Sequence, residues 1–181
     1  MNGNECLQAG RQITRISRVG LPLLGFLFAL ILLTSPVFGA ELTILAIPDL
    51  RGASGEDIRV PLVVDQVEHL AGVKLVINYD KELLAFKGGV RSKSTDSMMH
   101  VINDKTPGKL IVVMAAARGI AGKDVTLLTL FFSLKKGLTD HRETLIETTE
   151  VQLMGDDLKD IPCKAKAGKI TISPKSGTET K

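Results

Sequence analysis

The sequence predicts an all-β protein, a two-sheet β-sandwich of about nine strands. Three observations carry this prediction. Beyond residue 40, alternating apolar and polar residues and short β-branched runs recur along the chain. No window of useful length shows the 3.6-residue apolar period of a helix. Turn-forming residues separate the apolar runs at spacings of eight to twelve residues, which is typical of sandwiches and barrels.

The expected strands are short apolar or alternating runs bounded by Gly, Pro, Asn or Asp. They cover Leu42–Ile47, Ile58–Val64, Gly72–Tyr79, Leu84–Lys87, His100–Asn103, Lys109–Ala117, Val125–Leu134, Glu147–Met154 and Lys164–Ile172, the last two as a hairpin pair. The segment 48–56 is expected to be a turn region, and 93–97 a polar loop. Pro61 lacks a backbone donor, so its strand should lie at an edge or turn that position away from its neighbour.

The clearest alternation lies in Gly72–Tyr79. One face carries Val73, Leu75, Ile77 and Tyr79 and is expected to join the core; the other carries Gly72, Lys74, Val76 and Asn78. Lys109–Ala117 is apolar on both faces. If its even-numbered residues point inward, then the outward ones are Lys109, Ile111, Val113, Ala115 and Ala117.

The first forty residues predict a secretory signal peptide. Arg11, Arg15 and Arg18 precede an uncharged run of fifteen residues at 19–33, and small residues follow it. The run is shorter than the roughly 20 apolar residues of a spanning helix. We therefore assign 1–39 to the signal, with cleavage after Gly39 or Ala40, and expect an exported protein, extracellular or periplasmic.

Removal of this segment changes the charge balance. It holds three of the 23 basic residues and one of the 20 acidic ones, so the remaining 142 residues carry a net charge of +1. A nucleic-acid binder would need a basic stripe, and this near-neutral product argues against that class. Cys163 is the only cysteine left, so no internal disulfide is expected. It is interpreted as packing rather than as a reactive thiol.

Several segments together match the pattern of one known family. The run Gly55-Glu56-Asp57-Ile58-Arg59-Val60-Pro61 is similar to a strand of the form G-D-x-V-x-V-P, with Glu56 as an insertion. Gly72–Tyr79 followed by Asp80 and Leu84 is similar to a second segment of that family, which ends in a Tyr-Asp turn. The similarity continues through 108–112, 128–137 and 168–172. In this order, the segments resemble cohesin domains.

The resemblance implies a nine-stranded jelly-roll sandwich over 40–172, related in fold to some carbohydrate-binding modules, with 173–181 as a disordered tail. It also implies a non-catalytic module without cofactor. Family members bind dockerins, small calcium-bearing domains attached to polysaccharide-degrading enzymes. In the family, the partner lies on one sheet face, to which the strands matching Gly72–Tyr79 and Lys109–Ala117 contribute. The expected partner-binding residues are Lys74, Val76, Asn78, Ile111, Val113 and Arg118, with the apolar ones forming an exposed patch.

The sequence also bears on three other functions. A carbohydrate-binding module would need exposed aromatic rings, but the chain has no Trp, and Tyr79 and Phe132 lie on apolar strand faces. An enzyme is disfavoured because His69, His100 and His141 lack metal-site spacing and no phosphate-binding or nucleophile motif occurs. A structural subunit of an exported surface assembly stays open. Asp156, Asp157 and Asp160 lack the order of an EF-hand loop, and we interpret them as solvated turn residues rather than a calcium site.

Overall fold

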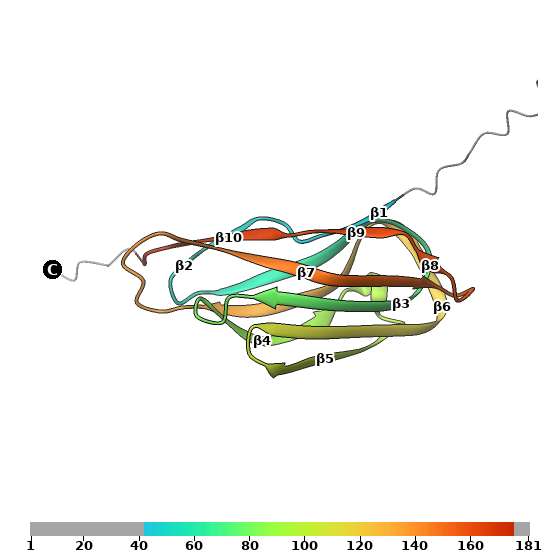
Figure 1. The fold of residues 1–181 in the computed structure, drawn as a ribbon, viewed down its shortest axis with the longest axis horizontal. Helices are drawn as coiled ribbons and strands as arrows, with labels where there is room; N and C mark the ends of the chain where they lie inside the picture. The colour runs from blue at the N-terminus through green and yellow to red at the C-terminus, as the bar shows by residue number, and fades with distance from the viewer. Residues whose placement is uncertain (1–41, 176–181) are drawn as a thin grey trace, which may run out of the picture. The chain divides into compact units, whose positions relative to one another are not determined.

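The computed structural model describes residues 42–175, which fold almost entirely into strands (Figure 1). One short 3₁₀ helix, η1 (Lys93–Thr95), interrupts them. Within the described residues the strands are β1 (Thr43–Ala46), β2 (Leu50–Ala53), β3 (Asp57–Tyr79), β4 (Leu84–Arg91), β5 (Met99–Thr106), β6 (Lys109–Leu134), β7 (Arg142–Gly155), β8 (Asp160–Ile161), β9 (Cys163–Lys166) and β10 (Gly168–Ser173).

Two long strands, β3 and β6, belong to both layers of the sandwich. They pair antiparallel along nearly their whole lengths, from Asp57 opposite Ser133 to Asn78 opposite Lys109. Register shifts between Leu62 and Val63 and between Val67 and Gly72 interrupt the ladder. Such irregularities bend strands and increase their twist, so the paired strands pass from one layer into the other.

The C-terminal half of β3 and the N-terminal half of β6 form the centre of one layer. There β5 pairs with β6, and β7 pairs with β3 on the other side. The arrows of β7, β3, β6 and β5 follow one another across Figure 1 in that order. The opposite halves of β3 and β6 form the second layer, with β4 beside β6 and β1 beside β3.

The first two strands pair in parallel with the last two. β1 lies beside β9, from Thr43 opposite Cys163 to Ala46 opposite Lys166. β2 lies beside β10, from Leu50 opposite Ile170 to Ala53 opposite Ser173. β10 also pairs antiparallel with the start of β7, from Gly168 opposite Ile146 to Ile172 opposite Arg142. The expected final hairpin is therefore wrong in its partner: β10 pairs with 142–146 rather than with 147–154, and the expected strand Lys164–Ile172 is divided between β9 and β10.

The core lies between the layers and centres on an aromatic cluster. Phe132 is completely buried, and its ring lies edge-on to Tyr79 at 5.1 Å and to Phe86 at 5.5 Å between centroids. Val73, Leu75 and Ile77 are at most 3% exposed, as their alternation predicts. The turn between β5 and β6 ends at Gly108, whose φ of 87° is open to glycine at little cost.

Several local predictions need correction. The segment 48–56 contains strand β2 rather than only a turn. The separate strands expected at 58–64 and 72–79 are one strand, as are those at 109–117 and 125–134. β10 includes Ser173, where the expected tail begins, and the Ser54 amide donates to the Ser173 carbonyl at 2.8 Å. The proposed signal peptide, residues 1–39, and the tail from 176 onward lie outside the described residues. From 42 to 175, no helix is long and apolar enough to span a membrane.

Candidate functional site

The solvent side of the β5–β6–β3–β7 layer, here called the outer face, is the candidate site. Residues opposite each other in a ladder project from the same side of the sheet, so the registers arrange its side chains in cross-strand rows. From one end to the other, the rows are Met99–Ala115–Gly72–Met154, Val101–Val113–Lys74–Gln152, Asn103–Ile111–Val76–Glu150 and Lys109–Asn78–Glu147.

The outer face is apolar on its β5 and β6 side. Met99 is 75% exposed, Val101 66% and Val113 45%, and Ile111 is partly exposed beside them. These exposures agree with the outward orientation expected for Ile111 and Val113. Apolar side chains that gather on one face mark surfaces at which proteins associate.

Val76 departs from the expectation. It lies in the third row, but only 8% of it is exposed, so it adds little to the accessible patch. Its ladder partners Ile111 and Glu150 flank it on both sides, and Lys74 reaches Glu150 beside it. Period-two reasoning assigns a side of the sheet correctly here, but it takes no account of cover by neighbouring strands.

The β3 and β7 side of the outer face is polar. The Lys74 ammonium contacts the Glu150 carboxylate at 2.5 Å, with both side chains about half exposed. Gln152 donates its amide to Asp160 at 3.1 Å. Asn78 is partly exposed and opposite Glu147. The outer face therefore combines an apolar half with a polar half that carries charges of both signs.

Arg118 lies apart from these rows. It is exposed, but β3–β6 pairing is interrupted between Ala115 and Ile120, so Arg118 stands in the bend of β6 rather than on the flat ladder. At this bend β6 and β3 approach each other closely. A Cβ added to Gly119 would lie only 2.3 Å from the backbone of His69. Of the six predicted residues, five share the outer face and Arg118 lies beyond its end.

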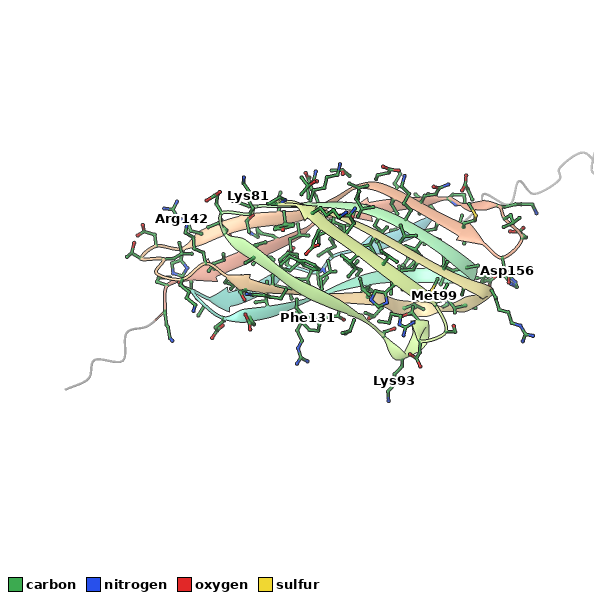
Figure 2. All side chains as sticks on the ribbon, turned by 90° about the horizontal axis from the view of Figure 1, so that it is seen from below. Lys81, Lys93, Met99, Phe131, Arg142 and Asp156 are labelled. Atoms are coloured by element: carbon green, nitrogen blue, oxygen red, sulfur yellow. The ribbon has the colours of Figure 1, made fainter. Side chains whose placement is uncertain are left out.

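Sequence reasoning missed Met99 and Val101, two of the most exposed residues of the outer face. The expected strand begins at His100, whereas β5 already begins at Met99 (Figure 2) and the preceding Met98 is fully buried. The alternation of Met99, Val101 and Asn103 with His100 and Ile102 is the signal that identifies them.

The three aspartates of the β7–β8 turn point to different partners. Asp156 accepts from the Gly119 amide at 3.0 Å and lies 3.7 Å from His69. Asp157 contacts the Lys159 ammonium at 2.8 Å. Hydrogen bonds from the side chain and the backbone amide of Lys159 hold the pKa of Asp157 below its usual value. Asp160 accepts from Gln152. Residues 42–175 contain no group of three His, Cys, Asp or Glu side chains arranged to hold a metal ion.

The aromatic rings serve the interior more than the surface. The partly buried Tyr79 and Phe86 pack against the fully buried Phe132, and Phe131 is half-buried on the opposite side of β6. Cys163 is partly buried, and this burial raises the pKa of its thiol. A raised pKa disfavours the reactive thiolate.

Comparisons with known proteins agree with this architecture. The chain is similar to a non-cellulosomal cohesin from the archaeon Archaeoglobus fulgidus, with a TM-score of 0.66, 16% identity, and coverage of 75% of this chain and 94% of the other. It is also similar to the sixth cohesin of scaffoldin B from Acetivibrio cellulolyticus, solved with a Cel5 dockerin mutant. Here the TM-score is 0.67 and the identity 18%, with coverage of 73% of this chain and 99% of the other. For the cohesin CaCohA2 from Clostridium acetobutylicum, the TM-score is 0.64 and the identity 24%, with coverage of 74% of this chain and 92% of the other.

At such low identities the structural similarity shows the fold alone. This fold is the jelly-roll sandwich of cohesins, as the sequence predicts. A search of curated proteins found no match. The model of the cohesin domain family matches residues 44–172, which is most of the chain. On that match, together with the shared fold, the chain belongs to the cohesin family.

Proposed function

We propose that this domain is a non-catalytic binding module that docks a dockerin-type protein partner on its outer face. The observation that carries the proposal is the exposure of Met99, Val101 and Val113 together on one layer of the sandwich. Membership of the cohesin family and the similarity to cohesins solved with dockerins support a protein partner.

Docking would proceed between preformed surfaces. Every outer-face residue of β3 lies between two hydrogen-bonded neighbours, β6 and β7, so the backbone is already ordered before the partner arrives. A preordered surface loses less conformational entropy on association than a loop does. The apolar half would supply desolvation energy, whereas Lys74 and Asn78 in the polar half would fix the partner's orientation.

Val113→Asp tests the site. The substitution places a charge between Val101 and Lys74 in the centre of the second row. Central interface positions dominate binding energy, and we expect the affinity to fall by about ten- to a hundredfold. The measurement is capture of proteins from secreted and envelope fractions of the source cells, followed by titration calorimetry with the captured protein.

Val90→Asp is the matched control. Val90 is 51% exposed, close to the 45% of Val113, but it lies on β4 in the other layer. Loss of capture with Val113→Asp but not with Val90→Asp, both variants remaining folded, supports the outer face. Unchanged capture with Val113→Asp, or equal loss with both, refutes it.

The proposal extends to the setting of the complex. An exported cohesin would arrange dockerin-bearing proteins in assemblies that degrade polysaccharide or cover the cell surface, and the predicted signal peptide supports export. Binding of the isolated protein to insoluble polysaccharides, with no protein captured, would favour the alternative of a carbohydrate-binding module. Capture of envelope proteins without dockerins would favour a structural subunit of a surface assembly.

A further inference from the structure

A hollow lies on the outer face between its first and second rows. Gly72 and Met154 of the first row and Val113, Lys74 and Gln152 of the second row line it, together with Val73 and Met114. Gly72 has no side chain, so the surface is lower at this position than at its neighbours in the ladder.

The hollow has the size and chemistry of a site for one apolar side chain. It is an open depression of about 150 Å³ in which apolar surface predominates. Both polar residues at its rim already have partners, since Lys74 contacts Glu150 and Gln152 donates to Asp160. A charged group entering the hollow would lose water without gaining a dedicated counter-ion, which disfavours charged anchors.

Met154 makes one side of the hollow adaptable. Methionine side chains are unbranched and flexible, so they repack around ligands of different shape and recur at binding surfaces with several partners. Met154 is partly exposed and lines the hollow from β7. Met99 belongs to the same row but lies outside the lining, beyond Ala115.

We propose that the hollow floored by Gly72 receives a single aliphatic, uncharged side chain of the docked protein, and that the absence of a side chain at position 72 sets this specificity. The inference rests on the proposed function, because it requires a protein on the outer face. A Cβ at position 72 would lie 3.2 Å from the Met154 Cβ, so a branched side chain there would occupy the hollow.

A small probe tests the hollow without any partner. Isotope-labelled protein is titrated with N-acetyl-leucinamide and, as a polar control, with N-acetyl-serinamide, while NMR follows amide and methyl shifts. The leucine probe is expected to shift the signals of Gly72, Val113 and Met154, and the serine probe to leave them in place. Absence of a leucine-specific shift at these residues overturns the proposal.

Filling the hollow tests the same proposal with the captured partner. Gly72→Val should abolish the probe shifts and weaken partner binding by about tenfold or more. Ala115→Leu places a longer side chain beside Gly72 in the same row, where it should cover the hollow and act in the same direction, and it keeps the test valid if Gly72→Val fails to fold. Ala85→Val, at an exposed position of β4 in the other layer, should change neither measurement.

The outcomes separate the two proposals. If Val113→Asp abolishes capture while Gly72→Val and Ala115→Leu bind normally, the outer face is correct and the hollow is not the anchor site. If Val113→Asp leaves capture unchanged, the proposed function fails, and a hollow anchoring the docked protein falls with it, even where the leucine probe still binds.

Discussion

Replacing Phe132 by leucine tests the assignment of the inner and outer sides of β6. Phe132 is fully buried and lies edge-on to Tyr79 and Phe86. Each such aromatic pair contributes about 0.5–1.5 kcal/mol beyond area burial, and the smaller leucine leaves part of the site unfilled. We expect the free energy of unfolding to fall by about 2–4 kcal/mol, below the upper end of the range for loss of a whole phenylalanine.

The neighbouring residue is the control. Phe131 is half-buried and, because strand side chains alternate, points to the other side of β6. Phe131→Leu should cost less than about 1 kcal/mol. Urea denaturation followed by circular dichroism measures both values, with the m-value checked for constancy. Equal costs, or a larger cost for Phe131→Leu, would refute the inward orientation of Phe132 and the placement of the aromatic cluster in the core.

Three further predictions concern the β7–β8 end and the cysteine. Asp156→Ala removes the acceptor of the Gly119 amide, so hydrogen exchange at Gly119 should accelerate by about fivefold, whereas Asp160→Ala should leave it unchanged. Because Lys159 holds the pKa of Asp157 below its usual value, the stabilisation by this contact is present above the ordinary carboxyl pKa and lost as pH falls through the lowered one. An NMR titration should show that pKa rising in Lys159→Met, and an unchanged pKa would contradict the cause. Burial raises the pKa of Cys163, so its reaction with a disulfide reagent at neutral pH should be slower in the native protein than in urea, and equal rates would argue against a protected thiol.

The strand faces were predictable because alternation reports directly on side-chain direction. Val73, Leu75 and Ile77 are buried and Val113 is exposed, as period-two reasoning requires. The exposure of Val76 was not predictable in the same way. It depends on Ile111 and Glu150, which approach from strands far away in the sequence. The residue pattern of one strand does not indicate which side chains of neighbouring strands will cover it.

The continuity of β3 and β6 was also beyond the sequence pattern. Two polar or glycine-containing segments indicate breaks between strands, because such residues usually end an apolar run. They are Glu68-His69 and Arg118-Gly119. In the structure both segments lie within continuous strands, although His69 leaves the extended conformation with a φ of 57° in the irregular region of β3. Gly119 approaches the His69 backbone, and Asp156 hydrogen-bonds to both residues there. These contacts are long-range, so they stabilise the bends without a local signature.

The parallel pairing of the first and last strands affects how the domain responds to tension. In parallel neighbours, a pull on the leading end of β1 and on the trailing end of β9 or β10 acts along the strands in opposite directions. The ladder bonds are then loaded in shear and must rupture together, rather than opening one after another as in a zipper. A pull on both ends of the domain would therefore be resisted by the same strands that close its fold.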